Sequence, residues 1–198
     1  MRAYNTMMLE TIARNELKKY KPLLLVGEPS AIPIEDMVER HYGLEVDYRF
    51  LRKNGSALGC TVFDNTLLPI WNPEEKRYEL LPVKRGTIVI SAALLDNRSD
   101  GRLRFTIAHE LAHWLIHREL YSGGGIAAAS ATKTSLEENP DVERQADILA
   151  TALLMPRNQV KHAFYALRGI TDPAATLAAL FDVSKQAMGI FLREHHLV

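Results

Sequence analysis

The chain has 198 residues, of which 47% are hydrophobic, and its 24 basic side chains balance 24 acidic ones. This length accommodates one full core and a small appendage, but not a second large domain. The balanced charge provides no overall field that would draw the protein to nucleic acid or to an anionic membrane. The single cysteine, Cys60, excludes an intramolecular disulfide framework. We expect it to be a small core residue rather than an inhibitory metal ligand.

The N-terminal region shows no export signal, because charged residues interrupt every apolar run, among them Arg2, Glu10, Arg14 and Glu16. The apolar run 23–26 is far too short to span a bilayer. A lone cysteine also suits a reducing compartment. We therefore expect a cytoplasmic protein with no membrane partner.

The first half of the chain predicts two helices followed by a small sheet. The helices are expected over 4–20 and 34–42. Alternating or β-branched residues predict three short strands, over 46–50, 60–63 and 87–91. Turns are expected between them at 71–73 and 84–86. Helices followed by a small sheet and further helices indicate an α+β domain rather than a parallel, doubly wound one.

The pentapeptide His109-Glu110-Leu111-Ala112-His113 lies in a stretch that predicts one amphipathic helix starting near Asp100-Gly101. Two histidines four residues apart share one face of a helix, so both imidazoles can reach one metal ion. The glutamate beside the first histidine then lies next to the open coordination position, where it can act as a general base. Two histidines that merely line a polar helix edge are the alternative, and the mid-helix position favours the metal site.

His117 continues the four-residue spacing, but it lies eight residues from His109, about 12 Å along the helix axis. One zinc ion, with ligands at about 2.1 Å, cannot bind both of these rings together with His113. We expect His117 on the helix surface or in contact with a metal ligand. The metzincin pattern is excluded, because Ile116 and Glu119 stand where it requires glycine and histidine.

A second helix is expected to begin at Asn139-Pro140, a capping residue followed by a residue suited to the first turn. Glu143 and Asp147 lie one turn apart beside its apolar stripe, so both can face the first helix. We assign Glu143 as the third metal ligand. Asp147 is expected to accept the spare ring N–H of a metal-bound histidine. A solvated acidic flank at the start of the helix is the alternative.

These residues carry a resemblance to a known family. The segments 104–113 and 143–147, with Leu153-Leu154-Met155-Pro156, resemble the ImmA/IrrE family of bacterial zinc metallopeptidases, and 34–46 does so more weakly. The resemblance implies a zincin-like metallopeptidase domain, with His109, His113 and Glu143 as Zn²⁺ ligands and Glu110 as catalytic base. It also implies a substrate class, helix-turn-helix transcriptional repressors, whose cleavage would derepress stress or mobile-element genes.

The segment 122–135, between the two metal-bearing helices, is rich in small residues and nearly chargeless. Its glycine triplet lacks the strand-to-helix frame of a phosphate loop. A lid that orders with substrate and a plain mobile insertion are both compatible with this composition. The strand 87–91 precedes the metal helix, and at a sheet edge it would pair with extended substrate backbone. An interior strand fits the same apolar run.

After Pro156 three short helices are predicted, over 157–167, 173–180 and 184–194. We therefore divide the chain into a peptidase domain, 1–156, and a helical C-terminal segment packed on it, 157–198. The stretch 177–188 resembles the middle of a helix-turn-helix, but the segment 157–198 holds only five basic against three acidic side chains, a net charge of +2. We expect packing or repressor docking rather than direct nucleic-acid binding.

These observations together predict a zinc-dependent endopeptidase in which Glu110 accepts a proton from the attacking water and returns it to the leaving amine. The oxyanion partner is open among Tyr121, His117 and His162. The alternative is a non-catalytic regulatory protein that binds a repressor or DNA. The intact Glu110 and the absence of a well-placed fourth protein ligand argue against a purely structural zinc.

Overall fold

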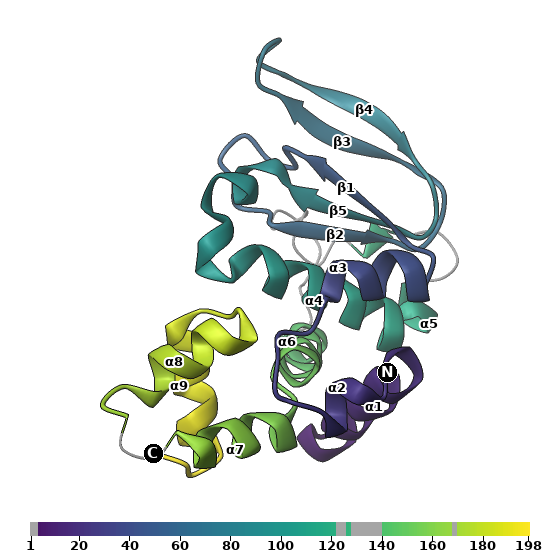
Figure 1. Cartoon of the computed structure of the whole chain (residues 1–198). Helices are drawn as coiled ribbons and strands as arrows, with labels where there is room; N and C mark the ends of the chain where they lie inside the picture. The colour runs from purple at the N-terminus through teal and green to yellow at the C-terminus, as the bar shows by residue number, and fades with distance from the viewer. Residues whose placement is uncertain (1–3, 122–125, 128–139, 168–169) are drawn as a thin grey trace.

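A computed structural model describes residues 4–121, 126–127, 140–167 and 170–198 of the chain. It has one four-stranded sheet, a separate two-stranded hairpin and helices gathered on the opposite side of the sheet from the hairpin (Figure 1). The predicted α+β class is therefore confirmed.

The four-stranded sheet has the order β1-β5-β2-β6, where β1 and β5 are parallel and the other two pairs are antiparallel. Its strands are Glu45–Arg49 (β1), Gly59–Val62 (β2), Thr87–Ser91 (β5) and Ile126–Ala127 (β6). Because β5 pairs with β1 on one side and β2 on the other, the hypothesis that it is an exposed edge for substrate is wrong. The apolar run of β5 is explained by burial on both faces.

The sheet separates two apolar cores, and strand alternation decides which side chain enters each. Ile88 and Ile90 of β5 belong to the main core on the helical side. Val89 and Cys60 belong to a smaller core between the sheet and the hairpin. Cys60 is fully buried there, as expected for a small core residue, and burial raises the pKa of its thiol.

The hairpin pairs β3 (Thr66–Asn72) with β4 (Arg77–Val83) and was not predicted. Trp71 and Asn72, expected in a turn, are the last residues of β3. Proline interrupts both strands, which is a signal against a strand when the sequence is read alone. A two-stranded ribbon tolerates Pro69 and Pro82 because, among the described residues, each strand has a sheet partner on one side only.

The N-terminal helices agree with the prediction in place but not in every detail. α1 spans Thr6–Tyr20, and the side chain of Asn5 caps it by accepting from the Met8 amide. The segment predicted as one helix over 34–42 begins with α3 (Ile34–Asp36) and continues as a π-helical turn. A further short helix, α2 (Leu23–Val26), lies between them.

Two long helices lie at the centre of the molecule. α4 (Arg102–Ile116) packs under the sheet, and α6 (Pro140–Leu154), seen nearly end-on in Figure 1, packs against both α4 and α1. A 3₁₀ segment, Ala92–Asp100, leads from β5 into α4. Gly101 is the N-cap of α4, where the helix start was expected, whereas the predicted cap Asn139 lies outside the described residues.

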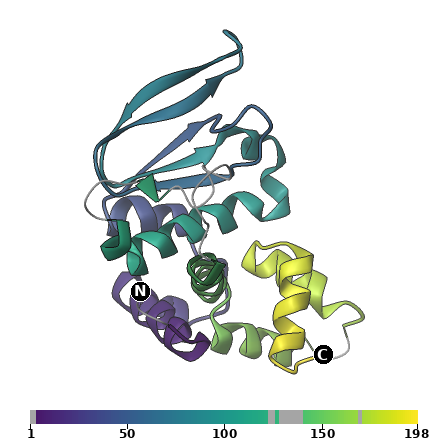
Figure 2. The same ribbon diagram turned by 180° about the vertical axis from the view of Figure 1, so that it is seen from behind.

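The three C-terminal helices occur where they were predicted, α7 (Arg157–Ala166), α8 (Pro173–Phe181) and α9 (Lys185–Glu194). Their buried side chains join the same apolar core as α1, α4 and α6. Figure 2 shows α8 and α9 on the side of α6 opposite α1, while α7 runs between them and the N-terminal helices, with Arg157 at its start paired with Glu10 of α1. No single helix in the described part of the chain is both long and apolar enough to cross a membrane, and only the sharply bent pair of α8 and α9 passes that test jointly.

The turn between α8 and α9 also contacts the start of α4. Gly101 has φ +72°, and a Cβ there would lie 2.6 Å from the Ser184 amide nitrogen, so this approach requires glycine. The Arg104 guanidinium donates to the Asp182 carbonyl oxygen (2.9 Å) and to the Ile32 carbonyl oxygen (2.7 Å). The helix that carries both histidines is thereby attached at its start to the C-terminal helices and to the N-terminal segment.

The centre of the main core gives a stability prediction. Leu149 of α6 is fully buried in that core, so Leu149→Ala should lower the free energy of unfolding by about 2–5 kcal/mol. Leu80→Ala in β4, where the side chain is 65% exposed, should change it by about 0.5 kcal/mol or less. Urea unfolding followed by circular dichroism measures both, and equal losses would contradict this position of the core.

Candidate metal centre

Two helices bring His109, His113 and Glu143 together. The histidines occupy consecutive turns on one face of α4, and Glu143 projects from the first turn of α6, which packs against that face. One ligand atom from each of the three residues lies within 4.8 Å of the others. The residues that the sequence indicated as metal ligands are thus neighbours in space, from positions 34 residues apart in the case of His109 and Glu143.

The spacing of these atoms suits a tetrahedral metal ion. His109 Nε2 lies 3.0 Å from His113 Nε2 and 3.3 Å from Glu143 Oε2, and His113 Nε2 lies 3.6 Å from Glu143 Oε1. Tetrahedral zinc with bonds of about 2.0–2.1 Å places neighbouring ligand atoms about 3.3 Å apart. Each histidine thus lies close to this separation from one of the two carboxylate oxygens of Glu143, and the three side chains are placed to hold one such ion.

Charge in the cluster also favours a cation. Asp147 Oδ1 lies 2.9 Å from His109 Nδ1, the contact expected for an acceptor of the spare ring N–H. Burial alone would lower the pKa of His109, but its hydrogen bonds to Asp147 and Glu143 outweigh burial and raise that pKa to about 10. Burial would raise the pKa of Glu143, and the two histidines instead lower it to about 2. A group of side chains that holds a proton this strongly also offers a divalent ion a favourable potential.

His117 caps the end of α4 and is buried, with only 1% of its surface exposed. We expected His117 either on the helix surface or in contact with a metal ligand, and the first of these is wrong. Its Nδ1 lies 3.0 Å from His113 Nδ1, and its Nε2 lies 3.3 Å from Gln145 Oε1. Burial and the neighbouring His113 lower the pKa of His117 to about 4, so its ring is neutral at neutral pH. Sequence reasoning identified the residue but not Gln145.

Glu110 is fully buried beside the two histidines, where β2 contacts α4. The Thr61 hydroxyl lies 2.8 Å from Glu110 Oε2 and 2.9 Å from the Glu110 carbonyl oxygen. A Cβ on Gly59 would lie 2.5 Å from Glu110 Oε1 and 2.8 Å from Thr106 Cγ2. The strand thus orients the carboxylate and leaves space for it only because residue 59 is glycine. The sequence did not indicate Thr61 or Gly59, because the residues of a short strand do not show which helix that strand will pack against.

The three candidates for an oxyanion partner are separated by the structure. Both ring nitrogens of His117 are occupied by His113 and Gln145. His162 is exposed on α7. The Tyr121 ring stacks on Phe63 (5.5 Å between centroids), and burial together with the charge of Glu143 raises the pKa of its hydroxyl. Of the three candidates, Tyr121 is therefore the one whose hydroxyl is affected by the charge of Glu143 in the metal cluster.

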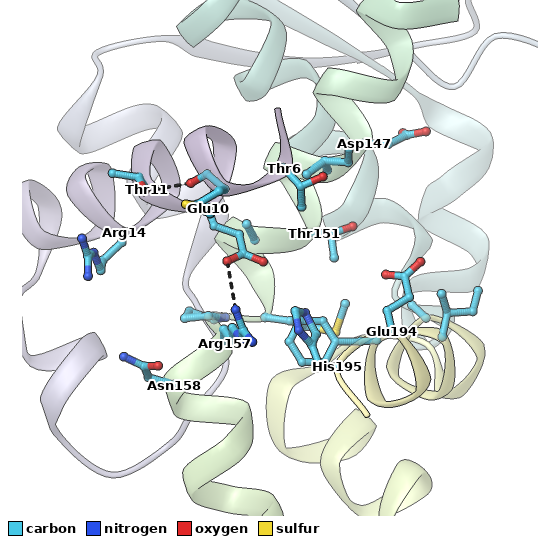
Figure 3. A pocket seen from close by; sticks show the side chains of 18 of the residues that line it. Thr6, Glu10, Thr11, Arg14, Asp147, Thr151, Arg157, Asn158, Glu194 and His195 are labelled. Carbon is cyan, nitrogen blue, oxygen red and sulfur yellow. Dashed lines mark hydrogen bonds and ion pairs between the residues drawn. The ribbon is translucent and has the colours of Figure 1, made fainter. Parts of the chain in front are cut away.

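A groove of about 870 Å³ borders the cluster on the side of Asp147. It lies between α1, α6, α7 and α9, and Figure 3 shows Asp147 and Thr151 at one end and the ion pair of Glu10 with Arg157 (3.7 Å) across it. The segment 122–135, for which a lid and a mobile insertion were considered, lies outside the described residues except for β6.

Comparison with known proteins agrees with this geometry. A family model, the IrrE N-terminal-like domain of peptidase M78, matches residues 64–193, well over half of the chain. The chain belongs to this family. The matched range includes α4, α6 and the three residues of this chain that could hold a metal ion, His109, His113 and Glu143. No significant sequence match to a curated protein was found.

The fold of this M78 protein also resembles a solved structure, that of a transcriptional regulator from Mycobacterium tuberculosis, with a TM-score of 0.51. The match covers 93% of this chain at 15% identity, so it shows a shared fold. The chain spans about 55% of that protein's length.

The close approach of β2 to α4 gives a second prediction. Gly59→Ala should force the Glu110 carboxylate or the backbone of β2 to move, at a cost of about 1–3 kcal/mol in the free energy of unfolding. Gly189→Ala is the matched control, because its Cβ would meet only Arg193 Nη1 at 3.6 Å within α9. That change should stabilise the helix by about 0.5–1 kcal/mol. Equal stability of the two variants in urea would contradict the packing of β2 on Glu110.

Proposed function

We propose that this protein is a zinc-dependent endopeptidase. The observation that carries the proposal is the meeting of two imidazoles and one carboxylate at tetrahedral spacing, with the buried Glu110 on the same helix turn as His109. Catalytic zinc sites use three protein ligands and keep a fourth position open, whereas structural sites normally use four. Among the residues that the structure describes, the metal-ligand group contains these three. The donor set of nitrogen and oxygen is one that zinc accepts.

The residues of the chain divide the chemistry among them. When bound, zinc would polarise the scissile carbonyl and lower the pKa of a water molecule. Glu110 accepts the proton of that water as it attacks and then transfers it to the leaving amine. The Thr61 hydroxyl holds the Glu110 carboxylate in place. We assign Tyr121 as the donor to the developing oxyanion, because its ring is held by stacking on Phe63, whereas both ring nitrogens of His117 are occupied and His162 is exposed.

The proposed substrate is a helix-turn-helix transcriptional repressor, cleaved to release stress or mobile-element genes. Its support is the resemblance of the metal-binding segments to the ImmA/IrrE family, together with the match to the IrrE N-terminal-like domain. Such a substrate would place the reaction in the cytoplasm. The C-terminal helices α7 to α9 would contribute to docking the repressor rather than contact DNA.

The mechanism predicts that Glu110→Gln binds zinc but is inactive. The amide keeps an oxygen that accepts from Thr61 but has no basicity, so turnover should fall by about 10²–10⁴-fold, the usual contribution of a general base. A proteome-wide search for new N-termini in lysate of the source cell, comparing zinc-loaded wild type with this variant, measures activity and finds the substrate together.

A repressor fragment that appears only with the wild type would support both the peptidase and its substrate. Wild-type turnover by Glu110→Gln would overturn the mechanism. If neither protein generates a new N-terminus in a lysate that contains candidate repressors, the result would favour non-catalytic binding of a repressor.

The ligand assignment predicts that Glu143→Ala weakens zinc binding by more than about 100-fold, beyond the 10–100-fold typical for loss of a group that only contacts a ligand. Competition with a chromophoric chelator measures the affinity. Asp141→Ala is the matched control, an acidic residue in the same first turn of α6 that does not belong to the metal group. Equal zinc affinities for the two variants would exclude Glu143 as a ligand.

A further inference from the structure

Two buried polar side chains next to the cluster have no part in the mechanism above. His117 is 1% exposed and Gln145 is 6% exposed, and they come from α4 and α6 respectively. Burying a polar group is costly unless it is hydrogen-bonded, so these two must be arranged to satisfy each other. Their contacts form one continuous line that ends at a metal ligand.

The line runs from Gln145 to His117 and then to His113. Gln145 Oε1 lies 3.3 Å from His117 Nε2, and His117 Nδ1 lies 3.0 Å from His113 Nδ1. The remaining nitrogen of His113, Nε2, is the atom that faces His109 and Glu143. Each histidine in the line is therefore contacted at both ring nitrogens.

With Gln145 Oε1 facing His117 Nε2, the chemistry of imidazole sets the order of donors along this line. A neutral imidazole carries one N–H and one lone pair. The Gln145 carbonyl oxygen can only accept, so His117 Nε2 carries the hydrogen and His117 Nδ1 has the lone pair. That lone pair requires the N–H of His113 at Nδ1, which leaves the Nε2 lone pair of His113 directed at the metal position.

We propose that Gln145 and His117 are positioning residues that hold His113 in the tautomer able to bind the metal ion. The inference rests on the metal site of the proposed function. It adds a pair of residues that contact His113 at Nδ1, the ring nitrogen that does not face the metal position. Without the acceptor at residue 145, His117 can carry its hydrogen on Nδ1 and donate to His113. His113 would then hold its hydrogen on Nε2, where a hydrogen excludes the metal.

The test measures zinc affinity by chelator competition rather than peptidase activity. Gln145→Leu removes the acceptor at nearly constant volume and should weaken zinc binding by about 10–100-fold. Gln159→Leu is the matched control for loss of a buried glutamine, since Gln159 is 4% exposed and its Oε1 has no hydrogen-bond partner among the described residues.

A second pair of variants changes the middle of the line. His117→Asn can place its side-chain oxygen near the position of Nδ1 and accept from His113, so we expect zinc affinity within a few-fold of wild type. His117→Leu leaves the His113 N–H without an acceptor and should lose at least 10-fold. This pair keeps the proposal testable if Gln145→Leu does not fold, which circular dichroism would show.

Nitrogen-15 NMR of the histidine rings separates this proposal from the metal site itself. Zinc affinity of folded Gln145→Leu equal to that of Gln159→Leu would overturn the role of Gln145. If the wild type binds no zinc, the proposed function fails, and the ring shifts of the metal-free protein still decide the inference. Hydrogen on Nδ1 of His113 supports it, whereas hydrogen on Nε2 overturns it.

Discussion

The contact between α4 and α6 is the constraint on which the site depends. Neither helix carries a complete set of ligands, because His109 and His113 lie on one and Glu143 on the other. The two helices pack against each other and bury small and apolar side chains in the same core, among them Ala108, Ala112, Ala146 and Leu149. Ligand atoms must meet within a few tenths of an ångström for tight binding. Packing of an apolar core therefore determines whether a metal ion can bind.

The remaining elements restrain α4 along its length. Gly101 and Arg104 attach its start to the turn between α8 and α9. Thr61 and Gly59 of β2 contact Glu110 in its middle, and His117 at its end is held by Gln145 of α6. A helix restrained at three points cannot rotate, so the two histidines and the carboxylate keep their relative directions. This arrangement is what general-base chemistry requires of a site, because small displacements of the reacting groups cost large factors in rate.

Sequence reasoning was effective where a pattern is local and poor where sheet order matters. The spacing of His109 and His113 within one helix is a consequence of the helical period, and the capping signals located α4 and the C-terminal helices closely. The interior position of β5 depends on pairing with β1 and β2, from about 40 and 30 residues away. Such pairing has no signal in the local sequence. The hairpin was not predicted because β3 and β4 each contain a proline, which argues against a strand. The contact of Thr61 with Glu110 was invisible for the same reason.

The Nδ1 atoms of the two histidines contact different groups, a carboxylate for His109 and a neutral imidazole for His113, and burial explains the difference. His109 contacts Asp147, whose side chain is 57% exposed, so water solvates that negative charge. His113 is fully buried, and a carboxylate behind it would add an unsolvated charge to a site that already contains Glu143 and Glu110. A divalent cation would balance two carboxylates but not a third. His117 and the Gln145 amide are neutral, so they provide His113 with a hydrogen-bond acceptor without adding a charge. The fully buried His113 ring is therefore oriented without a further buried carboxylate.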